Sequence, residues 1–434
     1  MPLFCTRGAA SARGFGMFAS LGGGYWIGLL GDGVEDDFGH SIAVDSSGNV
    51  YVCGYTQVSG TSDFQIAKYN TSGTIQWQRS LNGGSSDAGE SIAVDSSGNV
   101  YVCGRSNSFD GSQDIQIAKY DTSGTIQWQR RLRSLETDFG YSVAVDSSGN
   151  VYVCGYSDIS SPGASDFQIA KYDTSGTIQW QRRLGGGTSI EEGHSIAVDS
   201  SGNVYVCGYS NSTIGQYAFQ IAKYDTSGTI QWQRSLGSGV SNDFGFSIAV
   251  DLSGNVYVCG RSNASGTNNF QIAKYNTSGT IQWQRSLDGG SNDAGESIAV
   301  DSSGNVYVCG RSNPSGVMKF QIAKYDTSGT IQWQRRLGGG GSDFGYSIAV
   351  DSSGNVYVCG YSNATGSNNF LFAKLPGDGS KTGTYTVGGY SFTYASSSLT
   401  DAVSTLTDAA SSLTSAASSL ASAASSLTSS VTTI

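Results

Sequence analysis

One segment of this sequence occurs seven times with few changes. Its first copy reads SIAVDSSGNVYVCG, and the copies begin at Ser41, Ser91, Ser142, Ser195, Ser247, Ser297 and Ser347. The steps between these serines are 50, 51, 53, 52, 50 and 50 residues. A period of this length is typical of folds in which each repeat is one supersecondary unit packed against its neighbours. The chain is therefore expected to form a series of near-identical units rather than unrelated domains.

Each repeat contains four short runs that predict β-strands, which we call A to D. In the first repeat they are SIAVD, NVYVCGY, FQIAKY and TIQWQRSL, all rich in β-branched and aromatic residues. DSSGN separates A from B, and NTSGT or DTSGT separates C from D. Asp or Asn followed by a glycine that can take a positive φ is typical of tight hairpin turns. The unit is therefore predicted to be a four-stranded antiparallel meander.

Seven such units predict an all-β chain folded as a seven-bladed β-propeller over residues 24–375. The two ends of the repeat region support a closed ring. The last repeat lacks the IQWQR run, and a matching strand, GYWIGLL, precedes the first repeat. Trp26 in that strand stands 15 residues before Ser41, and the other six tryptophans precede the next repeat serine by 14 or 15. We therefore expect Trp26 to complete the last blade, beside Phe370.

The repeat resembles the bacterial SBBP-type β-propeller repeat, through its GNVYVCGY and FQIAKYDTSGTIQWQ elements, and more loosely NHL-type propellers. The resemblance covers roughly residues 24–375. It implies a propeller fold and a binding or scaffold role, and it implies no particular reaction, because one fold can carry many functions.

Seven of the eight cysteines occupy one equivalent position per repeat: Cys53, Cys103, Cys154, Cys207, Cys259, Cys309 and Cys359. Equivalent positions in neighbouring blades are expected to lie beyond the ~7 Å Cα separation that a disulfide allows. Dispersed thiols also make a poor metal site. We interpret them as small core residues between blades, which suits assembly in a reducing compartment. Cys5 stands outside the pattern and has no assigned role.

Residue chemistry gives little sign of catalysis. The two histidines, His40 and His194, occupy equivalent sites and suggest no catalytic triad. DSSGN lacks the acid-rich spacing of a calcium loop. The repeated DFG, first at Asp37, is interpreted as a turn leading into strand A. We predict no catalytic residue, no metal site and no cofactor. A net charge of −10 without basic runs disfavours nucleic-acid binding, and no classical signal peptide or membrane-inserted segment is expected.

The differences between repeats indicate where a ligand could bind. The A–B and C–D turns barely vary, whereas the D–A and B–C connections vary freely and share the other face of a propeller. Variable loops on a rigid frame are a usual place for recognition, although unconstrained drift explains them equally well. The residue before each repeat serine is His40, Glu90, Tyr141, His194, Phe246, Glu296 or Tyr346, and fifteen positions later stands Tyr55, Arg105, Tyr156, Tyr209, Arg261, Arg311 or Tyr361.

In these pairs both glutamates are matched with arginines, and tyrosines and histidines with tyrosines. Ion pairs and aromatic pairs of this kind stabilise a hairpin by ~0.2–1 kcal/mol each. That is one interpretation of the fourteen positions. The other is a ring of aromatic and charged groups that faces a ligand, such as a glycan, at the mouth of the channel.

Residues 376–434 have a different composition. TGTYTVGGYSFTYA predicts a β-hairpin connector within residues 376–396, turning at Gly388 and Gly389. Residues 397–434 repeat every seven positions, which predicts a helical coiled coil that joins copies of the chain as a dimer or trimer. The seam is Leu399, Val403, Leu406, Ala410, Leu413, Ala417, Leu420, Ala424, Leu427 and Val431. The alternative is a disordered Ser/Ala linker.

Short segments at the two ends resemble terminal segments of virion proteins from tailed marine phages. They are TRGAASARGFG, within a predicted N-terminal arm over residues 1–23, and SFTYASSSLTDA. The resemblance implies a virion structural or appendage protein, assembled in the host cytoplasm, that contacts other virion proteins and attaches to a cell-surface glycan or protein. The alternatives are a cellular propeller scaffold or adhesin, which would be cytoplasmic in a reducing setting, and a propeller lyase.

Overall fold

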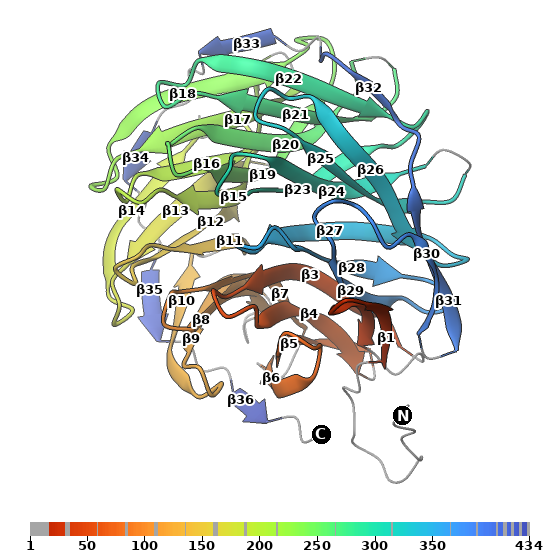
Figure 1. Cartoon of the computed structure of the whole chain (residues 1–434). Helices are drawn as coiled ribbons and strands as arrows, with labels where there is room; N and C mark the ends of the chain where they lie inside the picture. Colours follow the sequence, from red (N-terminus) through yellow and green to blue (C-terminus); the bar gives the residue numbers. More distant parts are fainter. Residues whose placement is uncertain are drawn as a thin grey trace.

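The structure is a computed structural model, and it is all-β in the part of the chain that it describes. That part comprises residues 17–30, 35–58, 60–82, 86–107, 112–134, 136–158, 164–185, 189–213, 216–264, 266–313, 316–364, 366–387, 389–404, 407–410, 415–417, 421–424 and 428–431. Within these ranges the strands form seven sheets arranged in a ring (Figure 1). The predicted seven-bladed β-propeller is confirmed.

The blades follow one another along the chain, and each is an antiparallel meander whose strand A is innermost. Blades 1 and 2 are β3 (Asp37–Val44), β4 (Val50–Val58), β5 (Thr61–Tyr69), β6 (Ile75–Asn82), β7 (Asp87–Val94), β8 (Val100–Asn107), β9 (Gln113–Tyr120) and β10 (Ile126–Arg133). Blades 3 and 4 are β11 (Asp138–Val145), β12 (Val151–Asp158), β13 (Ser165–Tyr172), β14 (Ile178–Leu184), β15 (Glu191–Val198), β16 (Val204–Thr213), β17 (Gln216–Tyr224) and β18 (Ile230–Gly237).

Blades 5 to 7 continue the same order. They are β19 (Asp243–Val250), β20 (Val256–Ser262), β21 (Asn269–Tyr275), β22 (Ile281–Asp288), β23 (Ala294–Val300), β24 (Val306–Ser312), β25 (Lys319–Tyr325), β26 (Ile331–Gly338), β27 (Asp343–Val350), β28 (Val356–Ser362) and β29 (Asn369–Leu375). The fourth strand of blade 7 comes from the N-terminal end of the described chain, as β2 (Tyr25–Leu30), and β1 (Met17–Gly22) pairs with its outer side.

Ring closure occurs where the sequence predicted it. β2 pairs with β29 in a register that places Trp26 opposite Lys374 and Leu30 opposite Phe370. Trp26 is buried in one cluster with Phe370 and Phe372 between blades 7 and 1. Its indole nitrogen donates to the carbonyl of Thr71 in blade 1 at 3.3 Å. The first and last parts of the ring are therefore joined by strand pairing, packing and a hydrogen bond.

The A–B turn is built as its sequence predicts. The amide of Gly48 donates to the carbonyl of Asp45 at 2.9 Å, and the Asp45 carboxylate accepts bonds from the amides of Ser47 and Asn49 and from the hydroxyl of Tyr51. Gly48 has a φ of +79°, which costs glycine little. The same arrangement recurs in each repeat, and this explains why DSSGN barely varies.

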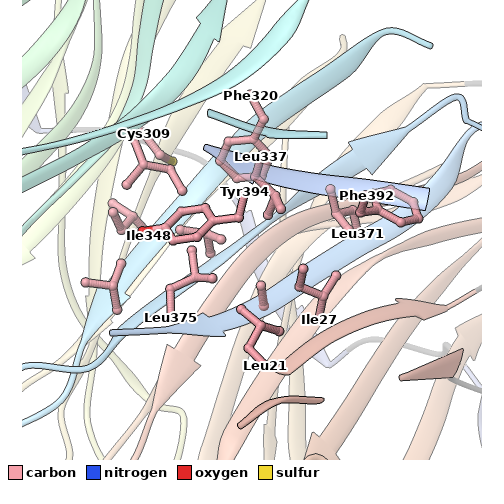
Figure 2. Close-up of a cluster of buried hydrophobic side chains, with 14 of the residues drawn as sticks. Leu21, Ile27, Cys309, Phe320, Leu337, Ile348, Leu371, Leu375, Phe392 and Tyr394 are labelled. Atoms are coloured by element: carbon pink, nitrogen blue, oxygen red, sulfur yellow. The ribbon is translucent and has the colours of Figure 1, made fainter. Parts of the chain in front are cut away.

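The hydrophobic core consists of seven clusters, one between each pair of neighbouring blades. Each cluster contains large apolar side chains from strands B, C and D of one blade and from strands A to C of the next. Figure 2 shows the cluster between blades 6 and 7, where Cys309 and Phe320 lie with Ile348 and Leu371. The seven repeat cysteines are buried and free, as predicted for core residues. Cys5 lies outside the described residues.

A second set of repeated contacts joins the outer parts of neighbouring blades. In blade 1 the indole nitrogen of Trp77 donates to the carbonyl of Thr122 at 3.1 Å. The guanidinium of Arg79 stacks on Trp77 and donates to the carbonyl of Gly124 at 2.6 Å. Equivalent Trp and Arg bonds recur from blades 2 to 6. The Trp and Arg of the QWQR motif therefore join each blade to the next through hydrogen bonds.

The segment after the propeller adds strands to the outside of the ring. β30 (Gly383–Val387) and β31 (Tyr390–Ser396) form the predicted hairpin, but it extends blade 6, because β31 pairs with β26. Phe392 and Tyr394 of this hairpin lie in the cluster of Figure 2. Residues 383–396 are therefore part of the propeller rather than a separate connector.

The rest of the tail differs from the prediction of a helical coiled coil. Its described parts are five short strands, β32 (Thr400–Ala402), β33 (Thr407–Ala410), β34 (Ser415–Ala417), β35 (Ala421–Ala424) and β36 (Thr428–Val431). They pair with the outer strands of blades 5, 4, 3, 2 and 1 in that order. Figure 1 shows these strands in blue around the outer rim. The described residues contain no helix.

Individual seam residues also differ from a helical arrangement. Leu399 is buried against blades 5 and 6, whereas Val403 is 68% exposed. Ala410, Ala417, Ala424 and Val431 belong to β33 to β36, so their backbones pair within this chain. Leu406, Leu413, Leu420 and Leu427 lie outside the described residues. The described tail thus gives no support to an oligomerisation helix.

The seven-residue period has a different physical origin. The tail residues opposite the equivalent leucine of each outer strand are Tyr394, Asp401, Asp408, Ser415, Ser422 and Ser429, a constant step of seven. Seven extended residues span about 23 Å, whereas seven helical residues span about 10 Å. The described strands β32 to β36 are extended and advance by one blade for every seven residues, so the sequence period matches the succession of blade edges.

Candidate binding site at the channel mouth

The fourteen residues singled out in the sequence lie where strands A and B approach the variable connections. In blade 2 the pairing runs from Ala88 opposite Arg105 to Gly89 opposite Gly104, and then from Ser91 opposite Cys103. Glu90 is therefore the extra residue of a β-bulge. The same irregularity occurs in all seven blades. The seven bulge residues are called the mouth ring: His40, Glu90, Tyr141, His194, Phe246, Glu296 and Tyr346.

Each mouth-ring residue contacts its predicted partner on strand B. The ion pairs join Arg105 to Glu90 at 2.9 Å and Arg311 to Glu296 at 2.6 Å. The aromatic partners have ring centroids 5.1–5.9 Å apart: His40 with Tyr55, Tyr141 with Tyr156, His194 with Tyr209, and Tyr346 with Tyr361. Phe246 meets the guanidinium of Arg261 at 5.7 Å. The predicted cross-strand pairing is confirmed in all seven blades.

The mouth ring also makes contacts between blades. His40 lies 5.4 Å from Tyr346 of blade 7, and its Nδ1 is 2.6 Å from Oε2 of Glu90 in blade 2. His194 stacks on Tyr141 at 4.4 Å and touches Phe246 at 5.5 Å. Hairpin stabilisation within a blade therefore accounts for only part of what these side chains do, because they also join neighbouring innermost strands.

Charge is distributed unevenly around the mouth ring. Burial acts to raise the pKa of Glu90, but His40 and Arg105 lower it more strongly, and the result is a pKa below the ordinary value. Glu90 thus stays ionised between two basic partners. In blade 4, Nε2 of His194 lies 3.4 Å from Oε2 of Glu192, and burial together with Glu192 raises the pKa of Tyr209. Two glutamates and two histidines are interspersed with three aromatic residues around the mouth ring.

A second layer of side chains lies two positions before the mouth ring, and none of its members is among the site residues predicted from the sequence. These positions carry Phe38, Ala88, Phe139, Glu192, Phe244, Ala294 and Phe344. The four phenylalanines stack on the strand-B partners, for example Phe139 on Tyr156 at 4.9 Å, and Arg105 of blade 2 lies over Phe139 at 5.0 Å. The DFG segment is therefore part of strand A, not a turn. The second residue of this segment varies between Phe, Ala and Glu from repeat to repeat, and this variation was the signal in the sequence that could have revealed the layer.

A buried acid occupies the position immediately before this second layer, at the start of strand A in every blade. The seven residues, each less than 4% exposed, are Asp37, Asp87, Asp138, Glu191, Asp243, Asp293 and Asp343. In blade 3 the Asp138 carboxylate accepts bonds from the amide and hydroxyl of Ser134 at 2.5 and 3.0 Å, which fixes the D–A connection. Burial raises the pKa of Asp138 to about 6, against these bonds and one from Ser157.

We find no group of three or more His, Cys, Asp or Glu side chains suited to a metal within the ranges that the structure describes. No helix of those ranges is long and apolar enough to span a membrane. The predictions of no catalytic residue and no cofactor stay predictions.

Comparison with known protein families covers the same repeats. The model of the SBBP beta-propeller repeat matches residues 26–60, 76–110, 127–161, 179–215, 231–266, 288–314 and 332–366, which is more than half of the chain. The chain belongs to the SBBP beta-propeller repeat family. A beta-propeller domain of unknown function also matches residues 46–75 and 96–126 of this SBBP propeller. Nothing in these comparisons bears on the resemblance of the termini to phage proteins.

Two curated proteins share part of the SBBP repeat sequence. Regulatory protein FlaEY of Caulobacter vibrioides is 31% identical over 117 residues, which is 24% of this chain and 12% of FlaEY. The uncharacterized WD repeat-containing protein L264 of Acanthamoeba polyphaga mimivirus is 29% identical over 176 residues, 34% of this chain and 12% of that protein. The matched region of this SBBP propeller thus spans about an eighth of each relative.

Solved structures with a similar outline are more distant. Sqt1 from Chaetomium thermophilum gives a TM-score of 0.46 at 15% identity, over 75% of this chain and 80% of that one. The polysaccharide lyase Uly1 gives a TM-score of 0.48 at 10% identity, over 78% and 90% of the two chains.

Proposed function

We propose that this SBBP propeller is a non-enzymatic recognition module whose ligand-binding surface is the face that carries the mouth ring and the variable connections. The observation that carries the proposal is that some repeated positions are nearly invariant whereas others vary from blade to blade. The serine, glycine, cysteine, tryptophan and arginine that join the blades are nearly the same in every repeat. At the mouth ring the side chains differ from blade to blade, although their cross-strand contacts are retained.

Such a surface can recognise an asymmetric ligand. A sevenfold backbone frame holds aromatic rings, carboxylates and guanidinium groups at fixed spacing, and each blade contributes a different combination. Rigid aromatic platforms beside a few polar groups are typical of sites that bind glycans or protein segments. We infer that the ligand is a glycan or protein on another molecule, most simply on a cell surface.

The setting in which the module works is a further part of the proposal. Display on a virion appendage agrees with the resemblance of the two termini to phage virion proteins, and a cellular scaffold or adhesin is the second setting. Mass spectrometry of purified particles distinguishes them, because a virion protein is present at stoichiometric amounts in the particle. Its absence from particles would leave the cellular role.

The binding proposal is tested with the full chain on arrays of glycans and cell-surface proteins. The informative variant is Tyr156→Ala, which removes a ring from the mouth face. The matched control is Gln127→Ala, because Gln127 has an exposed side chain at the C–D turn of the opposite face. We expect a ligand whose retention falls with the first variant and not with the second. Equal effects of both variants, or no retained ligand at all, would contradict the proposal.

A further inference from the structure

Arg261 in β20 differs from the other two arginines of the mouth. Arg105 and Arg311 each form an ion pair with the glutamate of their own blade. The corresponding position in blade 5 is Phe246, so Arg261 faces an aromatic ring instead. Its guanidinium carbon lies 4.6 Å from the ring centre of Phe244 and 5.7 Å from that of Phe246.

Within the described residues Arg261 has no carboxylate at ion-pair distance, and its buried Nε has no hydrogen-bond partner. The nearby glutamate, Glu296, is held by Arg311 at 2.6 Å. Burial lowers the pKa of Arg261, and the charge of Arg311 lowers it further. A guanidinium nevertheless stays protonated under physiological conditions. These three side chains, Arg261, Arg311 and Glu296, together carry two positive charges and one negative charge.

An aromatic platform lies beside this excess positive charge. Tyr217 at the start of β17 stacks with Phe244 at 5.0 Å, and Tyr209 contacts both rings, at 5.2 and 4.8 Å. Phe244 also contacts Arg261, whose guanidinium carbon lies 4.6 Å from its ring centre. One small region therefore places a guanidinium group, which can bind a carboxylate, beside a cluster of three aromatic rings.

We propose that Arg261 is the anion-binding group of a subsite for a hexuronate residue of an acidic glycan. Arginine binds a carboxylate through two parallel hydrogen bonds, and Arg261, unlike Arg105 and Arg311, has no carboxylate partner among the described residues. The C–H face of the sugar ring would lie on the aromatic platform, which favours a sugar over an acidic peptide. This inference rests on the proposed binding role of the mouth face.

The test uses the full-length chain and short oligouronates of galacturonate, glucuronate and mannuronate, measured by calorimetry. The same oligosaccharides with their carboxylates reduced to alcohols are the ligand controls. Arg261→Gln is the test variant and Gln127→Ala the control, because Gln127 has an exposed side chain on the opposite face of the propeller. Thermal unfolding checks that both variants are folded.

We expect one oligouronate to bind the parent chain, with at least tenfold weaker binding to Arg261→Gln and less than threefold change for Gln127→Ala. Failure of all three oligouronates to bind, or equal losses in the two variants, would overturn the inference. Equal binding of an oligoglutamate would overturn the assignment to a glycan. If reduced oligosaccharides bind parent and Arg261→Gln alike, the face binds sugars and only the role of Arg261 is lost.

Discussion

The hydroxyl of Ser347 accepts a hydrogen bond from the amide of Ile42 at 3.2 Å, across 305 residues of sequence. Ser347 lies in strand A of the last repeat, β27, and Ile42 lies in strand A of the first repeat, β3. In each of the remaining six pairs of neighbouring blades, a backbone amide of strand A donates an equivalent bond to the repeat serine of the preceding blade, at 3.1–3.3 Å. The repeat serine is therefore a link in a closed circle of hydrogen bonds around the channel.

Ser347→Ala should lower the free energy of unfolding by about 1–3 kcal/mol, because it leaves the amide of Ile42 without a partner at a buried position. Urea denaturation followed by tryptophan fluorescence measures the change. Ser352→Ala in the exposed A–B turn of the same blade is the control and should have little effect. Equal stability of the two variants would show that the circle contributes nothing.

Gly245→Ala should destabilise the interface of blades 4 and 5. A methyl group on Gly245 would overlap the ring of Phe219, which packs against this glycine from the preceding blade. Overpacking of this kind costs about 1–3 kcal/mol. The control is Gly340→Ala, where the added methyl meets no atom within 4 Å. Thermal unfolding of both variants should give a lower Tm for Gly245→Ala alone.

The tail register gives a prediction that depends on the number of inserted residues. One residue inserted after Ser404 shifts β33 to β36 by one position against their blades, and a one-residue slip turns every side chain to the opposite face. A duplicated heptad at the same point can loop out and restore the register. We expect a lower Tm and more self-association, by light scattering, for the single insertion, because unpaired edges recruit other strands. If the two insertions behave alike, the seven-residue step has no structural meaning.

The buried carboxyl of Asp138 should make stability fall as pH rises. Its pKa is about 6 in the folded protein, above the ordinary value of 3.8, so the folded state holds a proton that the unfolded state releases between these values. The resulting cost is fully present above about pH 6 and amounts to at most about 3 kcal/mol. Denaturation of the parent chain and Asp138→Asn from about pH 4 to pH 7 should show the variant gaining relative stability. A pH-independent difference would rule out this origin.

The repeat cysteines should react with thiol reagents only when the ring opens. All seven are buried, and burial is the first cause of the raised pKa of each thiol, for example Cys207. A protonated thiol is a poor nucleophile. Labelling of the folded chain followed by mass spectrometry should leave these seven unmodified while denatured protein reacts fully. Rapid labelling of Cys207 in the folded state would contradict the packing described for the blade interface.

Part of the candidate site could be predicted from the sequence. The match between Glu90 and Arg105 or between Tyr141 and Tyr156 follows from strand alternation and turn length, which are local properties. The contacts of His40 with Glu90 and Tyr346 could not be predicted, because they depend on how closely neighbouring blades approach at the centre. Arg261 was paired with Phe246 in the sequence, but its lack of a carboxylate becomes evident only from the distances.

The sequence by itself determined the blade and the closed ring. Hairpin turns and strand alternation are encoded within each repeat of about fifty residues, and the Trp26 strand supplies the run that the last repeat lacks. Only the tertiary structure decided the state of the tail. A seven-residue period is compatible with a helical seam and with a strand that advances one blade per period. The choice depends on whether open strand edges lie at the spacing of the extended chain, and the ring alone supplies those edges.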